Sequence, residues 1–178
     1  IKNNSFISKR LKKISEDIND KKDIYHVLSK NFKLNFKKKE LIKYKKYKQV
    51  VIIGMGGSIL GIKAIYSFLG KKIKKKIIFI DNLDENLIKK NVEKQSLKKT
   101  LFIIISKSGN TLETLANINL IKIDNFHSSN SIIITEEKTN SLNKFAKKKG
   151  IPTIEHKSYI GGRYSILSEV GMVPAYIM

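Results

Sequence analysis

Apolar runs and amphipathic segments alternate along most of the chain. Five runs rich in isoleucine and valine cover residues 49–54, 76–81, 100–106, 131–135 and 152–154. They lack polar alternation, which is typical of parallel strands that helices cover on both faces. Four segments with apolar residues at helical spacing lie between them, over residues 58–69, 84–97, 110–123 and 140–148. This alternation predicts an α/β fold with a doubly wound, parallel five-stranded sheet.

The first 47 residues lack strand-like runs. They are polar and rich in lysine, and apolar residues recur at helical spacing at Leu11, Ile14 and Ile18 and again between residues 27 and 32. We therefore expect two or three N-terminal helices before the sheet begins.

Two turns in the sheet region have the composition of anion-binding sites. The first turn, residues 54–58 (GMGGS), follows the first predicted strand, and the second turn, residues 106–111 (SKSGNT), follows the third. Each opens a predicted helix, where free backbone N–H groups and the helix dipole favour a phosphate. In the flavodoxin-like strand order 2-1-3-4-5, ligands bind between strands 1 and 3. That order would bring both turns to one phosphorylated ligand.

Two other phosphate motifs are compared with the first turn. Gly54 and Gly56 fit the start of a dinucleotide fingerprint, but Ile59 stands where its last glycine belongs. Asp81 could still bind a ribose hydroxyl, so this alternative stays open. The spacing from Gly56 to Gly61 fits a P-loop, but no Lys-Ser or Lys-Thr pair follows, which excludes it.

Composition narrows the function classes. The chain has 178 residues and a formal net charge of +21, and every basic residue except Arg10 and Arg163 is lysine. Nucleic-acid readers favour arginine forks and stacking aromatics, so we interpret the lysines as solvated and expect no nucleic-acid partner. There is no cysteine, and the three histidines lack metal-ligand spacing, so we expect no metal. No apolar run reaches the ~18 residues of a bilayer span and no signal peptide is evident, which predicts a cytoplasmic protein without membrane contact.

A third motif, residues 161–165 (GGRYS), places Arg163 beside paired glycines. Together, residues 51–58 (VIIGMGGS), 106–114 (SKSGNTLET) and 161–168 (GGRYSILS) resemble the phosphoglucose isomerase family. The first two alone would indicate only a sugar isomerase (SIS) domain, whereas the third is more specific.

The resemblance covers about residues 48–174. It implies a helical N-terminal segment at 1–47 and a SIS sugar-phosphate-binding domain at 48–178. The last residues, 172–178, are apolar and carry no helix stop signal. We therefore expect the domain to be truncated at its C-terminal end.

The family interconverts glucose 6-phosphate and fructose 6-phosphate by moving a proton between C1 and C2 through a cis-enediol. The resemblance implies that Arg163 stabilises the enediolate and that no cofactor is needed. It also implies a homodimer at full length. The phosphate would be held by Gly57, Ser58, Ser106, Lys107, Ser108 and Thr111. The family's glutamate base, histidine and ring-opening lysine belong to later segments, so we expect the chain alone to be inactive.

Two alternatives remain. The chain could be a non-catalytic SIS module that senses a sugar phosphate, or a basic nucleic-acid binder. Arg163 favours the isomerase, because a sensor has no need of an arginine at the reacting carbons. Residues 108–110 (SGN) depart from the Thr-Phe-Thr of many family members and are closer to the general SIS pattern.

Three further residue roles are expected. Glu113, in the first turn of a predicted helix, should cap that helix or pair with Lys107. His156 should lie at the surface or behind the site. Glu155 and Glu169 are the other candidate bases.

Overall fold

A computed structural model describes residues 3–88 and 97–178 of the chain. Its centre is one parallel sheet with the strand order β2-β1-β3-β4-β5. The strands are β1 (Gln49–Gly54), β2 (Lys76–Ile80), β3 (Thr100–Ile105), β4 (Ser131–Thr135) and β5 (Thr153–Glu155). The predicted doubly wound α/β fold and its flavodoxin-like order are thereby confirmed.

Helices connect the strands and precede the sheet. The α-helices are α1 (Asn3–Asp17), α2 (Lys38–Leu41), α3 (Gly57–Leu69), α4 (Glu85–Ile88), α5 (Leu112–Leu120), α6 (Ser141–Lys149) and α7 (Glu169–Ile177). Short 3₁₀ segments are η1 (Ile24–Leu28), η2 (Ile42–Tyr44), η3 (Gly70–Lys72), η5 (Leu97–Lys99), η6 (Ile123–Asn125) and η7 (Gly162–Leu167). The helix predicted over 84–97 begins with α4, and its continuation over 89–96 lies outside the described residues.

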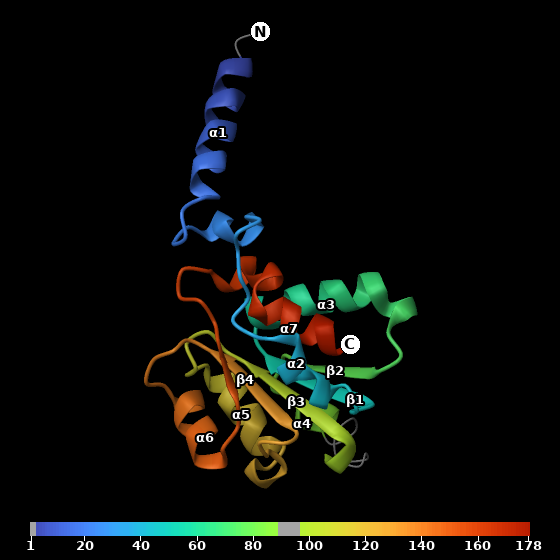
Figure 1. The fold of residues 1–178 in the computed structure, drawn as a ribbon. Coiled ribbons are helices and arrows are strands. Elements are labelled where there is room, and N and C mark those ends of the chain that lie inside the picture. Colours follow the sequence, from blue (N-terminus) through green and yellow to red (C-terminus); the bar gives the residue numbers. More distant parts are fainter. Residues whose placement is uncertain (1–2, 89–96) are drawn as a thin grey trace.

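The sheet is covered on both faces, as its continuous apolar strands require. Alternate strand residues such as Ile52 and Ile103 pack with α2, α3 and α7 in one core cluster. Their neighbours Ile53 and Ile104 pack with α4, α5 and α6 in the other. Figure 1 shows α3 and α7 on one side of the sheet and α5 and α6 on the opposite side. Each buried isoleucine contributes about 1.5–3 kcal/mol to folding relative to an exposed one.

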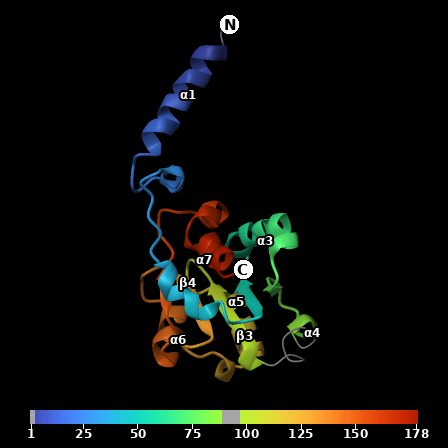
Figure 2. The same ribbon diagram turned by 45° about the vertical axis from the view of Figure 1, so that its right-hand side comes forward.

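The N-terminal segment has two different parts. Helix α1 extends away from the rest of the chain (Figures 1 and 2), and its Phe6 and Leu11 are each 61% exposed. Residues 38–47 instead lie against the sheet, where the Tyr47 hydroxyl donates to the Ser129 carbonyl over 2.9 Å and Tyr44 is buried. The division of the chain at residue 47 stays a prediction. Among the described residues, no helix has both the length and the apolar character to span a membrane.

Candidate functional site

The first and second turns leave the sheet at the same level. Gly54, the last residue of β1, is the register partner of Ile105, the last residue of β3. A Cβ on Gly54 would lie 2.9 Å from the Ile105 carbonyl oxygen, so the close approach of the two strand ends requires glycine there. The strand order reverses between β1 and β3, which is where ligands bind in open α/β sheets.

The first turn begins α3 without a side-chain cap. Gly56 is the N-cap residue, with φ 52° and ψ −122°, and Gly57 is the first helical residue. The alternative that the first turn is an ordinary strand–helix turn with Ser58 as N-cap residue is therefore wrong, because Ser58 already lies inside the helix. The Ser58 side chain makes no hydrogen bond within the described residues. Its hydroxyl is left available at the N-terminus of α3, where the N–H groups of Ser58 and Ile59 already donate to the carbonyls of Met55 and Gly56.

Three hydroxyls converge in the second turn. Ser106 Oγ lies 2.8 Å from Thr111 Oγ1, and Ser108 Oγ lies 3.4 Å from the same atom. Thr111 is the N-cap residue of α5, but its side chain makes no capping hydrogen bond. The hydroxyls and the N–H groups of the first turn of α5 are thus grouped at one helix N-terminus. Rotatable hydroxyls with a helix dipole behind them suit a phosphate group.

Helix α6 holds the second turn in place. Asn110 Oδ1 accepts a hydrogen bond from Ser141 N over 2.9 Å, and the Gly109 carbonyl accepts one from Leu142 N over 3.0 Å. Asn110 therefore accepts from the first residue of α6, whose N-cap residue is Asn140, while the N-cap residue of α5 is Thr111. Gly109 has φ 69°, and a Cβ there would lie 2.2 Å from the Asn140 side chain. This close contact and the positive φ require glycine at position 109.

The Lys107 side chain points away from the three hydroxyls of the second turn. Its Nζ donates to the Ser158 carbonyl over 2.7 Å and lies 3.7 Å from Glu136 Oε1. Burial raises the pKa of the Glu136 carboxyl, but Lys138 and Lys107 lower it more, so the pKa lies below its ordinary value. Glu136 takes the place expected for Glu113 as the partner of Lys107, which corrects that expectation. A direct contact between Lys107 and a phosphate stays a prediction.

The loop that carries Arg163, residues 158–168, lies against the start of α3 and is called the arginine loop below. A Cβ on Gly57 would lie 2.3 Å from the Gly162 carbonyl carbon and 2.6 Å from Arg163 N. In Figure 1 the segment before α7 lies beside α3. The Arg163 side chain is exposed, and within the described residues it has no hydrogen bond or ion pair. The structure therefore brings the three motifs together and leaves the guanidinium free.

A cluster of charged and polar groups lies behind the arginine loop, and within it Glu169 and His156 are buried. Glu169 pairs with Lys157 and accepts a hydrogen bond from Asn35 N over 2.7 Å, and Glu155 accepts one from Asn35 Nδ2 over 2.5 Å. His156 is 1% exposed, so of its two expected places, at the surface or behind the site, the one at the surface is wrong. Its burial lowers the pKa of the imidazole, whose Nδ1 lies 3.2 Å from the Lys157 carbonyl oxygen. The spacing of these residues along the sequence did not predict that they would lie together.

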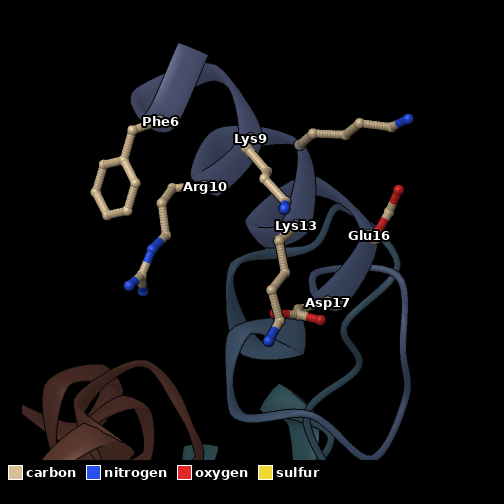
Figure 3. Close-up of a pocket in the computed structure, with 7 residues that line it drawn as sticks. Phe6, Lys9, Arg10, Lys13, Glu16 and Asp17 are labelled. Atoms are coloured by element: carbon tan, nitrogen blue, oxygen red, sulfur yellow. The ribbon is translucent and has the colours of Figure 1, made fainter. Parts of the chain in front are cut away.

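A hollow of about 760 Å³ lies along α1, but it does not resemble a binding site. It is lined by Phe6, Lys9, Arg10, Lys12, Lys13, Glu16 and Asp17. All seven come from one helix, so no opposite wall encloses a ligand (Figure 3). Arg10 lies 5.1 Å from the centre of the Phe6 ring. No group of three or more histidine and carboxylate residues suited to a metal occurs in the part of the chain that the structure describes.

Comparisons with known proteins agree with this geometry. Residues 6–178 match the family described as "Phosphoglucose isomerase". The glucose-6-phosphate isomerase of Campylobacter jejuni is 32% identical over 157 residues, which cover 84% of this chain and 39% of that protein. The glucose-6-phosphate isomerase of Methanocaldococcus jannaschii is 38% identical over 141 residues, covering 76% and 35%. The chain thus spans less than half the length of these relatives.

A solved structure has the same fold. The crystal structure of a glucose-6-phosphate isomerase from Chlamydia trachomatis is similar with a TM-score of 0.67 and 30% identity. The match covers 76% of this chain and 27% of that one.

Proposed function

The chain belongs to the phosphoglucose isomerase family, and on that premise we propose that it is part of an aldose–ketose isomerase that interconverts glucose 6-phosphate and fructose 6-phosphate. The observation that carries the proposal is the meeting of the first turn, the second turn and the arginine loop at the carboxyl edge of the sheet. Such an enzyme acts in glycolysis and gluconeogenesis, which places it in the cytoplasm. The proposed ligand is a sugar phosphate, with no nucleic-acid or membrane partner.

The phosphate group is bound where α3 and α5 begin. Its oxygens accept hydrogen bonds from the hydroxyls of Ser58, Ser106, Ser108 and Thr111, from the Lys107 ammonium and from the N–H of Gly57. The Lys107 ammonium adds positive charge beside the second turn while it supports the Ser158 carbonyl. Each hydrogen bond to the charged phosphate contributes about 1.5–3 kcal/mol.

Arg163 acts on the reacting carbons. Proton transfer between C1 and C2 passes through an enediolate, whose negative charge a permanent cation stabilises more than it stabilises the neutral carbonyl of the substrate. A preorganised donor of this kind contributes about 3 kcal/mol to transition-state stability. The guanidinium fork fits this role because it stays charged and offers paired donors. The Arg163 side chain has no hydrogen bond or ion pair within the described residues, which supports this role.

The contacts of the carboxylates bear on which group acts as the catalytic base. Glu169 and Glu155 are engaged by Lys157 and Asn35, so neither is free to act as the base. We therefore propose that the base comes from the rest of the relatives' length and that the active form is a homodimer. The proposed layout is a helical segment at 1–47 and a SIS domain at 48–178. A non-catalytic sugar-phosphate sensor is the second candidate, favoured by the SIS-like second turn at 108–110.

Calorimetric titration of the chain with fructose 6-phosphate tests the proposed phosphate site. Thr111→Val removes the hydroxyl at the centre of the second turn with little change of shape, so affinity should fall about tenfold or more. Thr139→Val, at an exposed threonine outside the site, is the matched control and should bind like the unchanged chain. Equal affinity for the unchanged chain and Thr111→Val would remove this site from the proposal.

A further inference from the structure

A buried ion pair closes the arginine loop at its two ends. Lys157 comes immediately before residues 158–168, and Glu169 is the first residue of α7 immediately after Ser168. Lys157 Nζ pairs with Glu169 Oε1, the Lys157 side chain is 12% exposed, and the Glu169 side chain is fully buried. The pair therefore joins the two ends of the loop from inside the protein.

The same pair connects the loop to the N-terminal segment. Asn35 N donates to Glu169 Oε1 over 2.7 Å, and Lys157 Nζ lies 5.0 Å from the centre of the Phe32 ring. Burying two charges is costly, and replacing such pairs by apolar residues often leaves stability unchanged or higher. A gain in folding stability therefore explains the presence of this buried pair poorly. Fixing the conformation of the loop explains it better.

Further contacts hold the loop backbone but leave Arg163 itself free. Lys107 Nζ, from the second turn, donates to the Ser158 carbonyl over 2.7 Å at the start of the loop. Ser165 Oγ donates to the Gly162 carbonyl over 2.7 Å within it. Since the Arg163 side chain has no partner among the described residues, its position depends on the backbone that carries it.

We propose that Lys157 and Glu169 are positioning residues, whose ion pair fixes the arginine loop and so holds Arg163 beside the two phosphate-binding turns. The inference rests on the proposed role of Arg163 in the isomerase. The effect of the pair on the loop, however, can be measured without any activity.

Hydrogen exchange of the backbone amides tests the effect on the loop. Glu169→Gln leaves Lys157 buried without a counter-charge, so the paired variant Lys157→Met with Glu169→Gln is made as well, because it removes both charges. Exchange over residues 158–168 should become about tenfold faster in the paired variant, with the sheet unchanged. Asp124→Asn, which breaks the exposed pair with Lys149, is the matched control and should leave the loop unchanged. Unchanged loop exchange in the paired variant would overturn the proposal.

Turnover in a polypeptide of the relatives' full length tests whether the pair acts through Arg163. Because small misplacements of a catalytic group are costly, the paired variant should lower kcat by about tenfold to a hundredfold with KM nearly unchanged. In an Arg163→Ala background the same change should cause no further loss, since the group it positions is gone. An equal loss in both backgrounds would overturn the positioning role and point to an independent role of Glu169.

The two measurements also separate this inference from the proposed function. If the unchanged full-length polypeptide neither turns over nor binds fructose 6-phosphate, the isomerase proposal fails. Faster loop exchange in the paired variant would then still support the ion pair as the element that fixes residues 158–168.

Discussion

At the residue scale, Arg163 is the side chain on which the proposed chemistry depends. In a polypeptide of the relatives' full length, Arg163→Ala should lower kcat about 10²–10³-fold, because it removes charge stabilisation made mainly in the transition state. Arg163→Lys keeps the charge but loses the planar fork, so its loss should be smaller. Steady-state kinetics and a melting curve on the same two variants provide the check. A large fall in Tm with kcat unchanged would mean that Arg163 only supports the loop.

His156 gives the protein a second testable property, a pH-dependent stability. Its pKa lies below the ordinary value of 6.5, because burial disfavours the charged ring. The unfolded chain therefore binds the proton more readily, and the stability that the neutral ring contributes is complete above about pH 6.5 and declines as the pH falls below it. Urea unfolding between pH 7.5 and about 5 should show this decline, and His156→Gln should weaken it. His127→Gln, at an exposed histidine, is the control. An unchanged pH profile in His156→Gln would contradict the assignment.

At the scale of elements, the contact between α3 and η7 joins the phosphate site to the arginine loop. Gly57→Ala would place a methyl group within 2.3 Å of the Gly162 backbone, so the two elements must separate. We expect a loss of about 1–3 kcal/mol in unfolding free energy and a weaker affinity for fructose 6-phosphate. Gly70→Ala, at the end of α3 where a Cβ meets nothing within 4 Å, should change neither. Similar melting curves and affinities for both variants would argue against a tight contact.

The elements also show which parts of the structure could be predicted from the sequence. The strands were predicted to within about one residue, because runs buried on both faces leave an unambiguous apolar signal. The predicted end of α5 was too late. Lys122 adopts φ 69° just after the helix, and the residue types there give no signal for a helix end. The role of Asn110 was missed because its partner lies on α6, 31 residues away. Likewise, the ion pair between Lys157 and Glu169 was missed, because the two residues are 12 positions apart and only the fold brings them together.

At the scale of the whole molecule, binding and turnover should separate. The 178-residue chain should bind fructose 6-phosphate yet show no isomerase activity above background, because the base is missing from the three motifs and general-base catalysis contributes about 10²–10⁴-fold. A coupled assay, with the Campylobacter jejuni relative as the positive control, measures this directly. Robust turnover by the chain would show that one of its own carboxylates acts as the base.

The register of β1 with β3 has one more consequence. Gly54 and Ile105 are register partners on adjacent strands, so the origins of the first and second turns are separated by the ordinary distance between such strands, about 4.8 Å. That interval is a constant of peptide geometry, so the two turns begin close enough together to reach a single anion. In the proposed phosphate site, the backbone rather than the side chains would therefore set how far apart the two groups of donors begin. A substitution of a side chain in either turn, for example at residues 108–110, would leave that spacing unchanged.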